Sequence, residues 1–316
     1  MNHARKLYEE CRKAVTEVVI GHDEAVRLLV LAVLTEGHVL LEGVPGVAKT
    51  TLVRAISRAL DLTFKRVQFT PDLMPSDIVG THIFNFQESR FHLVEGPVFT
   101  QVMLADEINR APAKTQAALL EAMQERQVSI EGEARDLPAP FFVLATQNPV
   151  EQEGTYPLPE AQLDRFLFKA RLDYPSAEEE AAVLHLHRGD NASLRARLDA
   201  IQPVAGAAEL AQAKEQVLAV TVREEVVQYV VELVRSTRNH VHLSLGGSPR
   251  ASLLLLMASK ATAAIEDRDY VTPDDVKSLL VPTLEHRILL TPSAEIEGLG
   301  PREVLHAIAN AVAVPR

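Results

Sequence analysis

The chain has 316 residues, of which 47% are hydrophobic and 24% charged, and its formal net charge at pH 7 is −11. This composition is ordinary for a globular protein, and the length favours two domains. The acidic balance argues against non-specific attachment to DNA or RNA, because such attachment needs a basic surface.

Cysteine usage and hydropathy bear on the cellular compartment. The single cysteine, Cys11, excludes an internal disulfide framework and is compatible with a reducing compartment. The first residues run into a mixed polar and apolar helix pattern without the hydrophobic core of a signal peptide. The most apolar stretches, residues 28–34 and 253–257, are too short to span a bilayer. We therefore expect no membrane segment and a cytoplasmic protein.

The chain begins with helical patterns and reaches its first strand near residue 38. Residues 7–36 are predicted to form two amphipathic helices with a break at residues 20–22. An apolar run at residues 38–41 follows and is typical of a short buried strand. Residues 51–60 then return to helical periodicity, so a tight turn must join this strand to a helix.

That turn is predicted to bind phosphate. Its residues are Gly43, Val44, Pro45, Gly46, Val47, Ala48, Lys49 and Thr50, followed by Thr51 at the helix start. A glycine-containing turn between a strand and a helix directs backbone N–H groups and a positive dipole end at a polyphosphate. Lys49 would neutralise the β- and γ-phosphate oxygens, and the Thr50 hydroxyl would ligate Mg²⁺. A connector with chance glycines is the weaker alternative.

One position departs from the general phosphate-loop pattern. The pattern G-x-x-x-x-G-K-[ST] has glycine before the lysine, whereas this chain has Ala48. Because alanine tolerates left-handed backbone poorly, we expect Ala48 to lie in the first right-handed turn of the helix.

Two further apolar runs end in polar signatures. Residues 102–105 lead into Asp106 and Glu107, and residues 141–145 lead to Asn148. Ligands bind outside the carboxyl ends of the strands in open α/β sheets, so these signatures should converge with the phosphate loop on one site. Asp106 would hold the Mg²⁺ shell and Glu107 would act as base toward the attacking water. A solvated Asp-Glu turn is the weaker alternative.

Asn148 has a plausible structural alternative. Its amide can donate to a phosphate oxygen and accept from the attacking water without adding negative charge. An ordinary Asn-Pro turn with Pro149 is the competing interpretation. The order of the three signatures along the chain favours the catalytic role.

Hairpins and helices complete the pattern. Residues 81–99 and 127–137 alternate apolar and polar side chains around polar tips, which predicts two β-hairpins. Beyond residue 175 amphipathic helices dominate, notably over residues 223–235, 249–265 and 273–290. Ser248 and Thr272 are predicted helix caps, each followed by proline, and Thr272 with Asp275 fits a capping box. We expect an α/β nucleotide-binding core with a parallel sheet over residues 1–175 and a helical domain over residues 176–316.

Four motifs together resemble the MoxR family of AAA+ ATPases. They are Gly43 to Thr50, Leu104 to Ala111, Ala145 to Pro149 and Leu158 to Phe166. The resemblance extends from about Val19 to the C-terminus, and Ala48 is itself typical of MoxR loops. It implies an αβα core, a helical lid and assembly into a homo-oligomeric ring, commonly a hexamer. The two hairpins would correspond to inserts of the clade that also holds magnesium chelatase subunits and MCM helicases.

The resemblance also assigns roles by position. Asn148 resembles sensor 1, Arg165 resembles an arginine finger that reaches into the neighbouring subunit, and Arg250 resembles sensor 2. Without the family, a surface ion pair with Asp164 and an ordinary solvated arginine would be the default readings. Val19 and Ile20 resemble the segment that lines the adenine pocket.

The motifs and the family resemblance together predict an ATPase that hydrolyses ATP with Mg²⁺. The energy would drive remodelling or activation of a client protein, or insertion of a metal cofactor into it. A von Willebrand factor A domain protein is a partner suggested by the family. A nucleic-acid motor and a nucleotide-gated scaffold without turnover are the alternatives. The acidic charge disfavours the first, and the intact Glu107 disfavours the second. The role of Arg110 stays open between a contact with an adjacent subunit and simple stacking on the ring surface.

Overall fold

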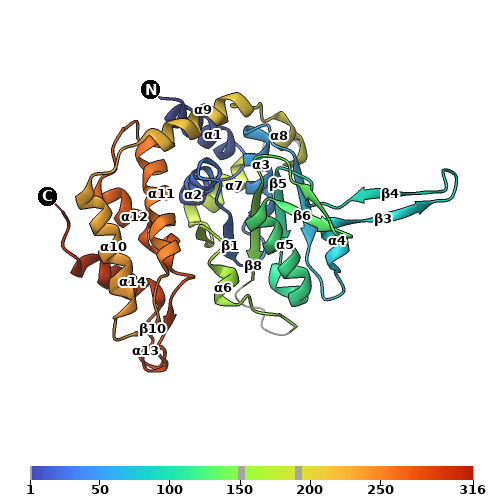
Figure 1. Ribbon diagram of the computed structural model, residues 1–316. Helices are drawn as coiled ribbons and strands as arrows, with labels where there is room; N and C mark the ends of the chain where they lie inside the picture. Colours follow the sequence, from blue (N-terminus) through green and yellow to red (C-terminus); the bar gives the residue numbers. More distant parts are fainter. Residues whose placement is uncertain (1, 149–153, 189–193, 316) are drawn as a thin grey trace.

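The computed structural model describes residues 2–148, 154–188 and 194–315. A five-stranded sheet in the order β2-β5-β8-β1-β9 forms the centre of the core domain (Figure 1). Its strands are β1 (Val39–Gly43), β2 (Phe64–Gln68), β5 (Val102–Asp106), β8 (Phe142–Gln147) and β9 (Phe168–Leu172). Every neighbouring pair is parallel, which confirms the predicted sheet class.

The two edge strands, β2 and β9, were not predicted. The central strands are almost wholly buried and read as uninterrupted apolar runs. The edge strands instead carry charged residues, Lys65 and Arg66 on β2 and Lys169 and Arg171 on β9. Charges on edge strands suppress pairing with other chains. They also interrupt the apolar run by which a strand is recognised in the sequence, so neither edge strand was predicted.

Helices cover both faces of the sheet. One face packs against α1 (His3–Thr16), α2 (Asp23–Leu34) and α3 (Lys49–Ala59), and the other against α4 (Pro75–Val79) and α5 (Ala113–Glu125). Alternation along β1 shows the division, since Val39 and Leu41 join the first cluster and Leu40 joins the second. The break between α1 and α2 falls at residues 17–22 and includes the predicted segment.

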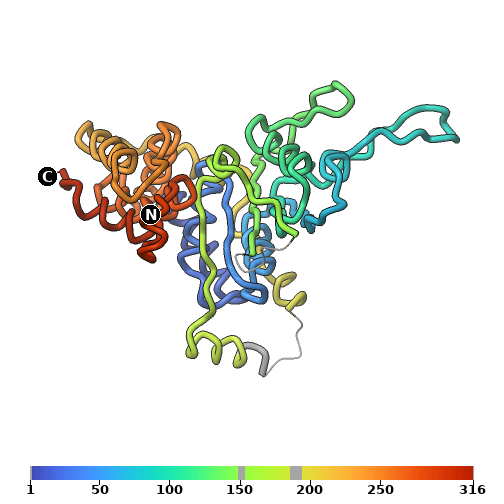
Figure 2. The backbone as a smooth tube through the Cα atoms, turned by 90° about the horizontal axis from the view of Figure 1, so that it is seen from below, coloured from blue at the N-terminus to red at the C-terminus, as the bar shows by residue number. Residues whose placement is uncertain are grey.

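Both predicted hairpins are present. They are β3 (Gly80–Asn85) with β4 (Arg90–Glu95) and β6 (Gln127–Ile130) with β7 (Glu133–Asp136). Both project from the side of the core that faces away from the C-terminal helices (Figure 2).

Helix α6 (Glu160–Leu163) lies between β8 and β9 of the core. Two helices, α7 (Ala177–Arg188) and α8 (Leu194–Ala200), connect the core to the C-terminal half. Helix α8 packs back on α3, where Arg58 and Asp199 form an ion pair of 2.7 Å. The division of the chain at residues 175–176 stays a prediction.

The C-terminal half is a helical bundle beside the sheet (Figure 1). Its helices are α9 (Ala207–Ala219), α10 (Glu224–Arg238), α11 (Pro249–Ile265), α12 (Pro273–Leu284), α13 (Pro292–Ile296) and α14 (Pro301–Ala311). A short antiparallel ribbon of β10 (Leu243–Leu245) and β11 (Leu289–Leu290) accompanies them. The cap at Ser248 and the capping box of Thr272 with Asp275 are confirmed.

The predicted helix over residues 273–290 is too long. Helix α12 ends at Leu284 because the next three residues, Glu285, His286 and Arg287, turn toward the core and bury their side chains there. Within the described ranges, no helix is long and apolar enough to cross a membrane.

Candidate active site

The phosphate loop lies between the carboxyl end of β1 and the start of α3. Gly43 is required by close approach, since a Cβ there would lie 2.6 Å from the Leu172 carbonyl oxygen of β9. Gly46 has a φ of +89° and open space where a side chain would stand. The loop therefore presents bare backbone at its tip, as a phosphate cradle requires.

The expectation for Ala48 is wrong. Ala48 has φ 59° and ψ 20°, which is left-handed backbone, and it precedes α3 rather than joining its first turn. Successive residues of opposite hand turn their N–H groups toward one concavity, and such a nest binds anions. The geometry of the loop therefore overrides the local preference of alanine.

Helix α3 begins at Lys49, with Thr50 and Thr51 in its first turn. The first N–H groups of a helix have no intrahelical acceptor, and Ala48 provides no side-chain cap for them. The Lys49 ammonium donates to the Gly43 carbonyl oxygen at 2.7 Å, so the lysine lies folded over its own loop.

The sheet register brings the three polar signatures together. Asp106 ends β5, and Ala105 pairs with Ala145 of β8. Gln147 of β8 pairs with Glu42 of β1, so the next residues, Asn148 and Gly43, are neighbours. Adjacent strands lie about 4.8 Å apart, so Asp106 and the loop are separated by about two strand spacings. The predicted convergence of these positions is therefore present; Pro149 lies outside the described residues.

Both carboxylate oxygens of Asp106 have partners. One accepts from the Arg66 guanidinium at 2.6 Å and 3.0 Å, and the other accepts from the Thr146 hydroxyl. Asp106 is nearly buried, so this arginine compensates a charge that would otherwise be costly.

Glu107 has unusual backbone and well-defined partners. Its φ of 57° and ψ of 51° are left-handed, and its N–H donates to the Thr146 hydroxyl at 2.8 Å. Its carboxylate accepts from Gln68 at 2.7 Å and from Arg110 at 2.9 Å. A non-glycine residue in this region costs of order 1–3 kcal/mol and tends to mark functional sites.

Sequence reasoning missed three of these partners. Arg66 and Gln68 lie on edge strand β2, and Thr146 precedes Asn148 by two residues. Arg66 also donates to Gln68 at 2.9 Å, so one hydrogen-bonded chain joins the two carboxylates. The only available signal was the weak alternation of residues 64–69, which did not identify a strand.

The segment predicted to line an adenine pocket lies beside the loop. Val19 is buried, Ile20 is half-buried, and the ring of His22 lies close to the backbone of Val47 in the loop. Burial lowers the pKa of His22, so this ring is neutral near pH 7.

Neither Arg165, the predicted arginine finger, nor Arg250, the predicted sensor 2, lies at the phosphate loop of its own chain. Arg165 and Arg250 line one cleft, together with His38, which precedes β1, and Leu167, which precedes β9. This cleft is at the amino edge of the sheet. The five residues of β1 span roughly 16 Å, and they separate the cleft from the loop.

The surroundings of the two arginines differ. Arg165 donates to the Leu120 carbonyl oxygen at 3.0 Å and to Gln124, at the end of α5. Arg250 is exposed in the first turn of α11, and within residues 2–148, 154–188 and 194–315 no carboxylate pairs with it. A cation at a helix N-terminus opposes the helix dipole, so its position points to function rather than stability.

Comparison with known proteins agrees with this geometry. Residues 38–168 match the ATPase family associated with various cellular activities (AAA), and residues 235–308 match the AAA lid domain. The chain is 43% identical to the chaperone MoxR1 of Mycobacterium tuberculosis, over 96% of this chain and 81% of that one. The chain belongs to the MoxR family of AAA+ ATPases.

Two other similar proteins match this chain over nearly its whole length. The chain is 46% identical to the protein YeaC of Bacillus subtilis, over 95% of this chain and 92% of that one. A crystal structure of a proposed ATPase from Cytophaga hutchinsonii superposes with a TM-score of 0.91 at 41% identity, over 99% and 96% of the two chains. The predicted family, the α/β fold with a helical lid and the ATPase class are confirmed. The roles of individual residues stay predictions.

Proposed function

We propose that this chain hydrolyses ATP with Mg²⁺ at sites shared between neighbouring subunits of a hexameric ring. The observation that carries this proposal is the separation of its two half-sites. The phosphate loop, Asp106 and Glu107 lie at the carboxyl ends of the strands. Arg165 and Arg250 lie near the amino ends. Arginines that cannot reach their own subunit's phosphates are suited to those of a neighbour.

The loop and acidic pair fit a magnesium-bound triphosphate. The backbone nest and the start of α3 suit phosphate oxygens, and Lys49 adds a positive charge beside them. Thr50 and Asp106 provide the hydroxyl and carboxylate oxygens that Mg²⁺ prefers. Bound there, Mg²⁺ would neutralise charge on the β- and γ-phosphate oxygens.

Glu107 is the proposed base. A water oxygen bonds to the γ-phosphorus, the bond to the ADP oxygen breaks, and Glu107 takes the water proton, which leaves ADP and phosphate. Its carboxylate is held by Gln68 and Arg110 in this structure, so it must exchange at least one of these hydrogen bonds for the water. Asn148 would orient the same water.

Arg165 and Arg250 would supply charge from the adjacent subunit. An arginine placed in this way stabilises the transition state by roughly 10³–10⁵ in rate in other nucleotide hydrolases. To act, Arg165 must leave its hydrogen bonds at the end of α5, which gives the interface a resting and an engaged state.

The client and partners are part of the proposal. One relative is named a chaperone, and this supports remodelling, activation or metal loading of a client protein. Hairpin β3–β4 carries exposed Phe86 and Phe91, 87% and 66% accessible, on an element that projects from the core (Figure 1). Exposed aromatic side chains suit a polypeptide client. By family resemblance, a von Willebrand factor A domain protein is a further partner, and the single cysteine supports a cytoplasmic location.

Replacement of Glu107 by Gln tests the proposal. Titration with a fluorescent ATP analogue should give unchanged affinity, and phosphate release should fall to background. Glu133→Gln, an exposed carboxylate on β7, is the matched control and should retain both. Continued turnover by Glu107→Gln would contradict the assigned base. Failure of the wild type to bind the nucleotide analogue, as expected only of Lys49→Ala, would contradict the site.

A further inference from the structure

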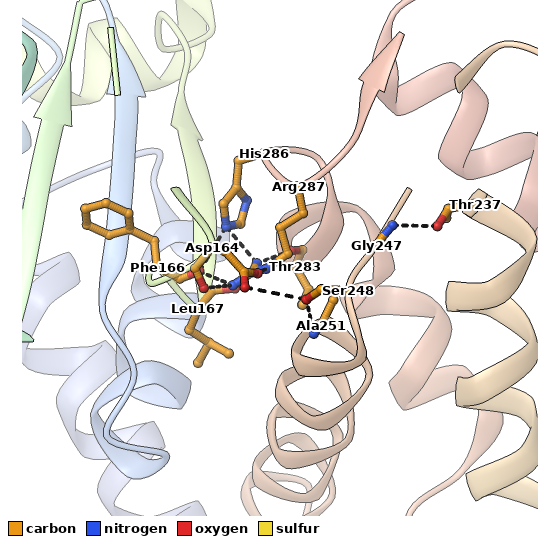
Figure 3. Close-up of polar contacts among 10 residues, drawn as sticks. All are labelled: Asp164, Phe166, Leu167, Thr237, Gly247, Ser248, Ala251, Thr283, His286 and Arg287. Atoms are coloured by element: carbon orange, nitrogen blue, oxygen red, sulfur yellow. Dashed lines mark hydrogen bonds and ion pairs between the residues drawn. The ribbon is translucent and has the colours of Figure 1, made fainter. Parts of the chain in front are cut away.

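The turn after α12 forms a polar junction between lid and core. Arg287 is 2% exposed at its side chain and forms an ion pair with Asp164 through Nε at 2.7 Å (Figure 3). The preceding Glu285 is fully buried at its side chain and binds Arg171 of β9 and Arg302 of α14. These contacts lie away from the phosphate loop, and the mechanism above gives them no role.

Other N–H groups of Arg287 fix a short stretch of core backbone, while Nη1 also donates to the Thr283 carbonyl oxygen of α12. Nη2 donates to the carbonyl oxygens of Asp164, at 3.1 Å, and Phe166, and Nη1 donates to that of Leu167 at 3.2 Å. These three residues flank Arg165 on both sides. One guanidinium therefore holds the backbone from which Arg165 projects.

The same junction reaches Arg250. Asp164 accepts a long contact of 3.5 Å from the Ser248 hydroxyl, and Ser248 caps α11 by accepting from the Ala251 N–H. Figure 3 shows Ser248 and Ala251 at the start of α11, and Arg250 lies between them in the sequence, in the first turn of that helix. Asp164 thus links the segment before β9, which contains Arg165, to the first turn of α11, which contains Arg250.

Stability alone is a weak explanation for this arrangement. Burial lowers the pKa of Arg287 to about 10, although the charge of Asp164 acts in the opposite direction. A buried ion pair is often no more stabilising than apolar residues of the same volume, but it does hold its partners in one fixed geometry. Arginine is also the residue whose planar fork can satisfy several fixed acceptors at once.

We propose that Arg287 is a positioning residue that holds Arg165 and Arg250 as one unit for presentation to the neighbouring subunit. This inference rests on the proposed shared site. It assigns to the lid a role in the geometry of the arginine half-site, distinct from the phosphate loop of the same subunit.

Arg287→Lys tests the inference, because it keeps the positive charge but removes the planar guanidinium that donates to several acceptors at once. Turnover should fall by about 10- to 100-fold, the scale expected of a misplacement of about 1 Å. Affinity for the fluorescent ATP analogue at the variant's own loop should not change. Hydrogen-exchange protection of residues 164–168 should decrease. Arg268→Lys is the matched control, since Arg268 forms a similar fork to buried Asp275 inside the lid, at 2.6 Å and 2.8 Å. It should lose thermal stability without losing turnover or protection at residues 164–168.

Mixed assemblies then decide which half-site Arg287 serves. Arg287→Lys has an intact loop, so mixing it with Lys49→Ala, which has intact arginines, should restore turnover above that of either alone. Mixing it with Arg165→Ala should restore none. Restoration by Arg165→Ala instead, or by neither partner, overturns the role of Arg287.

Two further measurements separate the possible failures. If Arg165→Ala and Lys49→Ala also fail to complement each other, the shared site itself is wrong and the inference falls with it. If Arg287→Lys does not fold, Asp164→Asn removes the same ion pair and should fall in the same complementation class. A different class for Asp164→Asn would overturn the inference.

Discussion

Ala48→Gly tests the left-handed conformation of the phosphate loop. An L-residue in this conformation costs roughly 1–2 kcal/mol relative to the right-handed one, and glycine removes that cost. Glycine also makes the unfolded chain more flexible, which costs about 0.4–1 kcal/mol. Ala48 is exposed and its φ is 59°, so no packing change enters the comparison. The difference is a stabilisation of about 1 kcal/mol.

The sign of this effect discriminates between two conformations. In the first turn of a right-handed helix, the same replacement would destabilise by about 1 kcal/mol. Urea unfolding without nucleotide measures the free energy, and Ala211→Gly, at an exposed position inside α9, is the matched control that should lose about 1 kcal/mol. A loss for Ala48→Gly similar to that of the control would refute the left-handed assignment.

Two further predictions concern Gly43 and His38. Gly43→Ala places a Cβ 2.6 Å from the Leu172 carbonyl oxygen and should lower the free energy of unfolding by about 1–3 kcal/mol in the same urea assay, while an unchanged value would contradict the close approach of β1 and β9. Burial lowers the pKa of His38 to about 3, so below pH 6.5 the unfolded state takes up a proton that the folded state does not, and stability falls as pH falls. Between pH 6.5 and pH 5 wild type should therefore lose about 1.6 kcal/mol more unfolding free energy than His38→Gln, and parallel pH profiles of the two would contradict the neutral buried ring.

The central strands, the loop and the helix caps could be predicted because each is encoded locally. An apolar run before a polar signature identifies β1, β5 and β8, and capping residues adjacent to proline identify the starts of α11 and α12. These signals need no knowledge of what the segment packs against.

The remaining features depend on contacts between distant residues. Gln68 and Glu107 are separated by 39 positions, and Arg287 and Asp164 by 123 positions, so no local pattern links them. The left-handed Ala48 was missed because the tertiary geometry of the loop overrides its local preference. The end of α12 was misplaced because residues 285–287 satisfy core groups instead of continuing the helix.

The separation of the half-sites is tested most directly by mixing two inactive variants. Arg165→Ala keeps the loop and acidic pair, and Lys49→Ala keeps the arginines, so only mixed interfaces can combine an intact loop with intact arginines. Random assembly of equal amounts should restore about one quarter of wild-type turnover per subunit, since half of the loops are intact and half of their neighbours are competent. Turnover that stays at the level of the separate variants would contradict a site shared between subunits.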